Sequence, residues 1–175
     1  SFNYFDGIDG ALSITSITTL SFLYFLVNNY EFDLFLLIIL IPVSVFLFFN
    51  FSILKLPKMF LGDSGSLLLG FIISFILIYL AKEKLSHPIL LAWSISIFVY
   101  EFLSINFIRL KNNRNPFIAG KDHLHHLFFK FSNSILITNL FIVIIHITLF
   151  LIGYISFILM NSLVSIILFV FLFIV

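Results

Sequence analysis

Three short polar segments interrupt an otherwise apolar chain, and they hold most of the side chains that could do chemistry. They are Asn3 to Gly10 (NYFDGIDG), Lys58 to Ser66 (KMFLGDSGS) and Arg114 to His126 (RNPFIAGKDHLHH). The first two carry carboxylates beside glycines, whereas the third carries histidines and cations. Carboxylate and amide oxygens suit a hard divalent cation, and cationic side chains suit phosphate oxygens. These residue types are typical of a site that handles phosphate groups.

In the first segment, Asn3, Asp6 and Asp9 recur every three residues. If this segment is helical, the three side chains lie along one face and can reach a common ligand. Gly7 and Gly10 would leave that face uncrowded. The alternative is a solvated acidic start of a helix, where carboxylates interact favourably with the macrodipole.

In the second segment, Asp63 stands between Gly62 and Gly65, where an apolar run begins. Backbone N–H groups at a helix start are unpaired, and such a turn can present one carboxylate to a cation. The alternative is that Ser64 or Ser66 is an ordinary N-cap and Asp63 stabilises the positive end of the helix.

In the third segment, His123, His125 and His126 fall within four residues, beside Lys121 and Arg114. Such a cluster is suited to phosphate oxygens. A zinc site is disfavoured because the histidines are crowded and the chain has no cysteine. A basic loop that touches acidic lipid head groups is the other alternative.

The composition shows which solvent surrounds these segments. Hydrophobic residues make up 62% of the 175 residues and charged ones 10%, and the mean hydropathy is +1.23. A water-soluble domain is excluded, and most of the chain must lie in lipid. The net charge of +1 gives no sign of a polyanion partner, so nucleic acid is not expected. Without cysteine, neither a disulfide nor a thiolate metal site can form.

Long apolar runs predict helices, because about 20 residues cross a bilayer core and helices satisfy their own backbone there. We predict helices near residues 11–29, 34–53, 66–81, 88–108, 134–155 and 159–175. Pro42 predicts a kink in the second helix, and Pro88 predicts the start of the fourth. The expected fold is all-α: a polytopic transmembrane helical bundle of about six spans, forming a single membrane domain over residues 1–175.

The basic residues orient this bundle. Six spans place seven of them on the side of the N-terminus: Lys55, Lys58, Arg109, Lys111, Arg114, Lys121 and Lys130. Lys82 and Lys84 fall on the opposite side. Basic loops stay cytoplasmic, so the N-terminus and all three polar segments are expected there. Because two spans separate each segment from the next, the three can converge on one cytoplasmic site.

Three other ionisable residues lie near or within the spans. Glu101 is inside the predicted fourth helix, and it is expected to snorkel or to find a partner toward the cytoplasmic end. His146, in the middle of the fifth, is expected to form a hydrogen bond between helices. His87 lies on the outer side and cannot join the site.

Together the segments resemble those of the polyprenyl-phosphate N-acetylhexosamine-1-phosphate transferases, a membrane branch of glycosyl transferase family 4. NYFDGIDG resembles the family's Asn-x-x-Asp-Gly-x-Asp-Gly segment and FLGDSGSLLLGF its Gly-Asp-x-Gly-Ser segment. NPFIAGKDHLHHLF resembles its Pro-Phe…His-x-His-His loop, in the form of the GlcNAc-type branch. The resemblance covers essentially the whole chain, as the C-terminal part of the family fold.

The resemblance implies transfer of an N-acetylhexosamine 1-phosphate from a UDP-sugar to polyprenyl (undecaprenyl) phosphate, with release of UMP. This reaction initiates a cell-surface glycan at the cytoplasmic face of the bacterial inner membrane. It further implies Mg2+, with Mn2+ as an alternative, and leaves a homodimer open. The implied metal ligands are Asp63 and Asn3, the acidic pair that supports catalysis is Asp6 and Asp9, and the phosphate-binding residues are Arg114, Lys121, His123, His125 and His126.

The chain also departs from the family. Members carry an adjacent Asp-Asp pair in an earlier cytoplasmic loop, and no Asp-Asp dipeptide occurs here. Gly120 and Lys121 stand where the family commonly has Asp-Arg. We therefore expect the C-terminal portion of a longer transferase. The alternatives are an intramembrane aspartyl protease, in which Asp63 pairs with Asp6 or Asp9, and a catalytically silent scaffold or transporter fragment.

Overall fold

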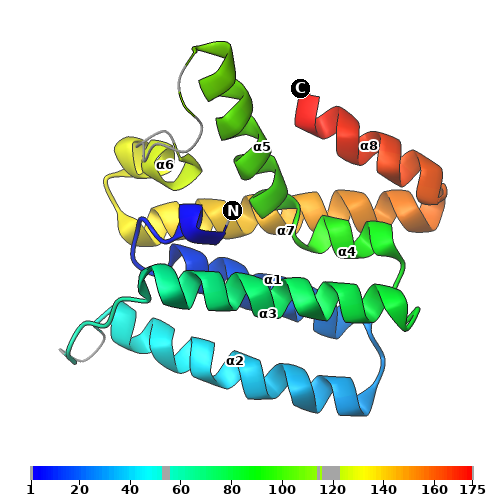
Figure 1. The fold of residues 1–175 in the computed structure, drawn as a ribbon, viewed down its shortest axis with the longest axis horizontal. Helices are drawn as coiled ribbons and strands as arrows, with labels where there is room; N and C mark the ends of the chain where they lie inside the picture. Colours follow the sequence, from blue (N-terminus) through cyan, green and yellow to red (C-terminus); the bar gives the residue numbers. More distant parts are fainter. Residues whose placement is uncertain (1, 53–55, 114, 116–122, 175) are drawn as a thin grey trace.

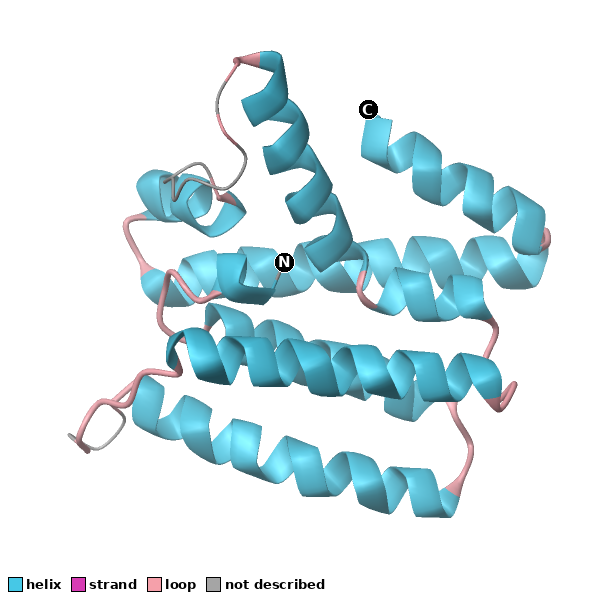
Figure 2. Ribbon diagram, in the orientation of Figure 1, coloured by secondary structure: helices cyan, strands magenta, loops and turns pink. Residues whose placement is uncertain are grey.

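The structure is a computed structural model that describes residues 2–52, 56–113, 115 and 123–174. Within these ranges the chain forms helices and no strands, which confirms the all-α expectation (Figures 1 and 2). The helices are η1 (Phe2–Phe5), α1 (Ala11–Leu26), α2 (Tyr30–Asn50), α3 (Gly62–Lys82), α4 (Pro88–Ser94), α5 (Ser96–Lys111), α6 (Leu124–Ser132), α7 (Ile135–Leu159) and α8 (Ser162–Ile174).

The expectation of six full-length spans needs correction. In the part of the chain that is described, α2, α3 and α7 are long and apolar enough to cross a bilayer, and α4 with α5 passes the same test as a broken pair. Helices α1 and α8 are apolar but have 16 and 13 residues. At 1.5 Å per residue α1 is about 24 Å long, shorter than a hydrocarbon core of about 30 Å.

Helix α1 lies at the centre of the bundle and packs against α2, α7 and α4. Its buried side carries small polar residues as well as apolar ones, among them Thr15 and Thr19. Their hydroxyl groups donate to Ala11 O at 2.7 Å and to Thr15 O at 3.0 Å, so neither is left unpaired. Small residues let helix backbones approach closely where no water is present to drive packing.

The predicted fourth helix is broken. Helices α4 and α5 meet at Ile95 with a bend of 71°, and α5 leaves the layer of the other helices (Figure 1). A break frees backbone groups, which must find partners inside a membrane protein. His146 Nε2 lies 2.9 Å from Ser94 O, at the break. This contact confirms the interhelical hydrogen bond expected for His146.

The two ends of the bundle differ in their connections. Figure 1 shows η1, the start of α3 and α6 at one end, and the α1–α2 and α3–α4 connections at the other. Pro88 starts α4 as predicted, whereas α2 continues as one helix through Pro42. Helix α6 differs from the expectation, since none of the predicted helices covers residues 109–133.

Candidate functional site

Residues of all three polar segments line one pocket of about 210 Å3 at the end of the bundle where α3 begins. Its lining consists of Asn3, Tyr4, Asp6, Gly7, Asp63, His123, His125 and His126. About 120 residues separate the first of these from the last. The chain thus returns to the same end of the bundle between one segment and the next, as the topology argument expected.

The acidic wall of the pocket comes from the first two segments. Helix α3 begins at Gly62, which adopts a φ of +66° that glycine tolerates, so Asp63 lies in the first turn. Ser66 Oγ donates to Asn3 Oδ1 at 2.8 Å and ties η1 to this turn. Neither Ser64 nor Ser66 is the N-cap, because Leu61 holds that position without a side-chain bond.

Asp6 and Asp63 repel each other across this wall. Burial raises the pKa of the Asp6 carboxyl above its usual value, and the charge of Asp63 raises it further. No hydrogen bond joins the two carboxyl groups in the described structure. A cation placed between them would relieve the repulsion.

The histidine wall comes from the start of α6. His125 is fully buried, and neither of its ring nitrogens has a hydrogen-bond partner. Its ring centroid lies 4.3 Å from that of His126 and 5.5 Å from that of His123. Burial, together with the two neighbouring histidines, lowers the pKa of His125 to about 3, so the ring is neutral near pH 7.

Glycine is required where the two walls meet. A Cβ on Gly7 would collide with His125 Nε2. The first segment therefore approaches the buried imidazole with its backbone, which leaves the ring nitrogen at the pocket. This close approach gives a steric reason for the glycine between Asp6 and Ile8.

Asp9 lies outside the pocket lining. Its carboxylate forms an ion pair with Lys58 Nζ at 2.6 Å, and its backbone oxygen accepts from Asn139 Nδ2 at 2.9 Å. The expectation of one helical face for Asn3, Asp6 and Asp9 is therefore corrected. The helical turn ends at Phe5, so Asp9 follows a turn and points elsewhere.

Asn50, the last residue of α2, forms hydrogen bonds to both the first and the second polar segments. Its Oδ1 accepts from Gly10 N at 2.6 Å, and its Nδ2 donates to Met59 O at 2.8 Å. One amide thus links the first polar segment to the second. Because both the oxygen and the nitrogen of a buried amide need hydrogen-bond partners, these two bonds fix the positions of the two segments relative to each other.

The remaining expected residues are only partly placed. His123 and His126 line the pocket, while Arg114 and Lys121 lie outside the described residues. Sequence reasoning missed Tyr4, whose ring packs 4.8 Å from that of His123, and the two asparagines Asn50 and Asn139. A polar amide near the end of an apolar helix costs free energy in lipid unless it has hydrogen-bond partners. The presence of an asparagine at such a position could therefore have indicated both Asn50 and Asn139.

An apolar groove adjoins the histidine wall. It has a volume of about 250 Å3 and lies between α5, α6 and α7. Glu101 and Leu124 belong to its lining, and Leu124 follows His123 directly. The rest of the lining is largely aliphatic: Ile97, Tyr100, Ser104, Ile105, Ile108, Leu127, Ile145 and Leu149.

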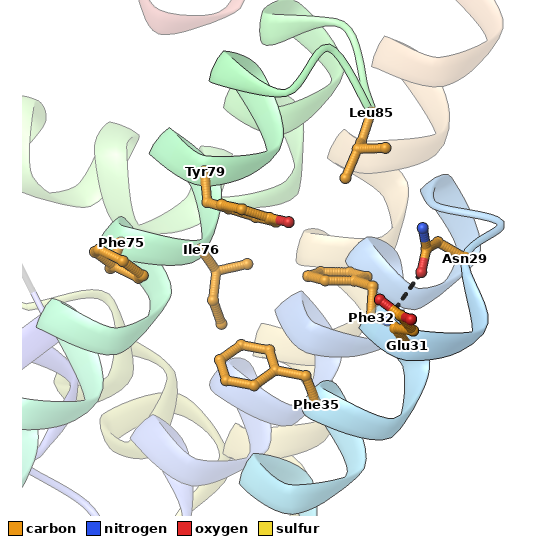
Figure 3. A pocket seen from close by; sticks show the side chains of 8 residues that line it. All are labelled: Asn29, Glu31, Phe32, Phe35, Phe75, Ile76, Tyr79 and Leu85. Carbon is orange, nitrogen blue, oxygen red and sulfur yellow. Dashed lines mark hydrogen bonds between the residues drawn. The ribbon is translucent and has the colours of Figure 1, made fainter.

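A different pocket, of about 290 Å3, lies between α2 and α3 at the opposite end. Figure 3 shows the aromatic rings of Phe32, Phe35 and Tyr79 around it, with Glu31 at its side. Asn29 belongs to its lining, but its Oδ1 already accepts from Phe32 N at 3.1 Å as the N-cap of α2. The two pockets therefore differ in chemistry: the first is lined mainly by carboxylate, amide and imidazole groups, and the second mainly by aromatic rings and aliphatic side chains.

These features define a class: a polytopic helical membrane protein with one polar pocket at an end of the bundle and an apolar groove beside it. Residues 1–81 match the family model described as glycosyl transferase family 4. This part of the chain belongs to that family.

Named relatives agree with this assignment. The chain is 30% identical over 134 residues to an undecaprenyl-phosphate alpha-N-acetylglucosaminyl 1-phosphate transferase of Escherichia coli (strain K12), which covers 73% of this chain and 36% of the relative. The protein of the same name from Yersinia pestis is 31% identical over the same shares. The chain thus spans about a third of the length of these relatives. No solved structure matches it significantly.

Proposed function

We propose that the chain carries the pocket of an enzyme that transfers an N-acetylhexosamine 1-phosphate from a UDP-sugar to polyprenyl phosphate. The observation that carries this proposal is the convergence of three distant segments on one pocket beside an apolar groove. A lipid phosphate has both chemistries, since its head suits the pocket and its tail suits the groove. The relatives, whose name specifies undecaprenyl phosphate and an N-acetylglucosaminyl 1-phosphate group, support the same pairing.

A magnesium ion fits the acidic wall, with Mn2+ as an alternative. Among the described residues, no group of three or more His, Cys, Asp or Glu side chains could hold a metal ion. The proposed donors are the carboxylates of Asp63 and Asp6 and the amide oxygen of Asn3, which line the same pocket, with water completing the shell. When bound, the ion would neutralise charge on the phosphates.

The chain's own residues have separate roles in this proposal. The histidines of α6 bind phosphate oxygens, and the neutral ring of His125 donates one N–H from a site where water is excluded. An oxygen of the lipid phosphate forms a bond to the sugar-bearing phosphorus. The bond from that phosphorus to the UMP oxygen breaks, and UMP leaves with the electron pair. Asp9, paired with Lys58, positions the first segment rather than the reacting groups.

The proposal places the pocket on the cytoplasmic face of a bacterial inner membrane. Among the described basic residues, Lys58, Arg109, Lys111 and Lys130 lie in or next to the connections that lead to the pocket-lining segments, whereas Lys82 and Lys84 lie at the α3–α4 connection at the opposite end. Loops rich in Lys and Arg remain in the cytoplasm, where nucleotide sugars are made. An aspartyl protease is less favoured, because its carboxyl pair would share a proton and Asp6 and Asp63 form no such bond.

Asp63→Asn tests the proposal in the protein as its gene encodes it, in membranes. The substitution should lower transfer from radiolabelled UDP-N-acetylglucosamine to undecaprenyl phosphate about 10³-fold or more at saturating Mg2+, because it removes a charged ligand. Membrane insertion should be unaffected, since Asp63 is exposed. Removal of divalent cations by EDTA should stop transfer, and added Mg2+ should restore it.

The matched control is Glu31→Gln, which removes a carboxylate at the opposite end of the bundle. Its transfer rate should equal that of the wild type. Near-normal turnover of Asp63→Asn would remove Asp63 from the metal role. A wild-type protein that forms neither labelled lipid nor UMP with any UDP-N-acetylhexosamine would end the proposal.

A further inference from the structure

Glu101 is a buried carboxylate on α5, only 7% exposed. Its Oε1 accepts from Leu124 N at 3.1 Å and lies 3.3 Å from His123 Nδ1. The second contact is within ion-pair distance but is not aligned as a hydrogen bond. A carboxylate removed from water is costly unless other groups compensate it. Both groups that face Oε1 belong to the start of α6.

Among the described residues, no side chain of α6 or of its N-cap residue caps the start of this helix. His123 is the N-cap residue; its backbone oxygen accepts from His126 N at 3.0 Å, but its side chain makes no bond to the helix and does not pair with Leu124 N. The carboxylate of Glu101 supplies an acceptor for Leu124 N from another helix, and its negative charge complements the positive helix end. The sequence expectation of a partner toward this end is met by His123 and Leu124.

The position of α6 sets the histidine wall. Leu124 is the first residue of α6, and His125 and His126 are the next two. An anchor on Leu124 N–H therefore fixes where both following rings enter the pocket. On its other side, His123 packs against Tyr4, with 4.8 Å between ring centroids.

Glu101 also belongs to the lining of the apolar groove. The same side chain thus lies beside the groove and holds the helix that forms one wall of the pocket. A lipid phosphate whose tail occupied the groove would have its head near this junction.

We infer that Glu101 is a positioning residue: it caps α6 from α5 and holds His123, which sets the histidines that bind phosphate. The inference rests on the proposed function for its catalytic consequence. Its structural part, the placement of α6, can be measured without any activity.

Histidine labelling tests the structural part. Diethyl pyrocarbonate carbethoxylates accessible imidazoles, and mass spectrometry of the protein in membranes gives the rate at each histidine. Glu101→Ala should raise the labelling rates of His123 and His125 at least about 5-fold, because the freed helix start exposes buried rings. His87, at the far end, should keep its wild-type rate. Unchanged rates at His123 and His125 would overturn the inference.

Two further variants separate the cap from the charge. Glu101→Gln keeps an oxygen for Leu124 N–H but loses the charge that faces His123, so its labelling rates should fall between wild type and Glu101→Ala. It also remains informative if Glu101→Ala does not fold. Asn106→Ala is the matched control, because Asn106 lies on the same helix, is partly exposed and bonds only to Phe102 O at 2.7 Å. It should label like the wild type.

A double-mutant cycle tests the catalytic part. Glu101→Ala should lower transfer about 10- to 100-fold, as loss of a supporting hydrogen bond typically does. In a His123→Ala background the same change should cost at most a third of that factor, because the two residues act together. Equal losses in both backgrounds would show a general structural defect and refute the coupling. If the wild type transfers nothing, the proposed function fails, while the labelling still decides the role of Glu101.

Discussion

Two histidines, His125 and His146, are both fully buried, yet their surroundings differ. His146 lies in α7 between Phe22 and Phe98, and its Nε2 is bonded to Ser94 O. His125 lies at the pocket, and neither of its nitrogens has a partner. Burial alone therefore does not separate a structural histidine from a functional one. The partner does: Nε2 of His146 is paired with a backbone oxygen and only its Nδ1 lacks a partner, whereas both nitrogens of His125 lack one.

The difference has an energetic side. A buried polar group without a partner costs about 1–3 kcal/mol. His146 uses one nitrogen to compensate a carbonyl that the break between α4 and α5 would leave unpaired. His125 compensates nothing within the described structure, so the single N–H of its neutral ring is left for a ligand oxygen such as that of a phosphate.

Of the two histidines, His125 is expected to have the larger effect on activity. His125→Ala should lower kcat/KM for the UDP-sugar about 10²- to 10³-fold, because it removes a preorganised donor in a site sheltered from water. Its thermal stability should change little, because the gain from removing an unpaired buried ring is offset by the cavity that alanine leaves. Initial rates against UDP-sugar concentration and melting in detergent measure both. An unchanged nucleotide dependence would favour the alternative of lipid head-group binding.

The pH dependence of stability sharpens the same comparison. Because the pKa of His125 is lowered to about 3 in the folded protein, the unfolded chain takes up a proton first as pH falls below about 6.5. Wild-type stability should therefore decrease from pH 6.5 toward pH 3, relative to His125→Ala. Parallel melting curves for the two proteins across this range would contradict the burial of the ring.

A smaller effect on activity is expected from Gly7→Ala. The added Cβ would collide with His125 Nε2, and a displacement of about 1 Å can cost up to 10²-fold in rate. We expect a loss of about 10- to 100-fold in transfer. Gly153→Ala is the matched control, since its Cβ would collide with Trp93 in the core. The Gly153→Ala variant should lose stability but keep its activity per folded molecule. If Gly7→Ala lost only stability and Gly153→Ala lost activity, the functional role assigned to Gly7 would be wrong.

The smallest effect on activity is expected at His146. His146→Leu fills the space but leaves Ser94 O without its partner, so the protein should lose about 0.6–2 kcal/mol of stability. Transfer per folded molecule should match the wild type. Denaturation in detergent, combined with activity normalised to folded protein, checks both values. If transfer falls while stability does not, the distinction between the two histidines is wrong.

The sequence predicted the parts of the molecule that short-range rules govern. Long apolar runs gave α2, α3 and α7, and Pro88 gave the start of α4. The expectation that the three polar segments return to one end agrees with the pocket that Asp6, Asp63 and His125 share. These features depend on bilayer thickness and on the number of spans, which a sequence displays directly.

The features that sequence reasoning missed depend on tertiary contacts. The break at Ile95 lies in an apolar run without proline, and only His146 from another helix reveals why it is tolerated. Asp9 fits the spacing of a shared helical face, but the turn after Phe5 directs it to Lys58. Helix α6 depends on a cap from Glu101, which lies 23 residues away. No local pattern encodes such partners.

The 71° bend between α4 and α5 also bears on how the two proposed substrates would arrive. In the proposed function, the apolar groove beside α5 would open toward the lipid, and the polar pocket with its carboxylates would open toward the aqueous phase. A long-chain acceptor could then reach the reaction centre by lateral diffusion in two dimensions, and a water-borne nucleotide by diffusion in three. The reaction would take place at the membrane surface, so the lipid acceptor need not leave the bilayer and the nucleotide need not enter it.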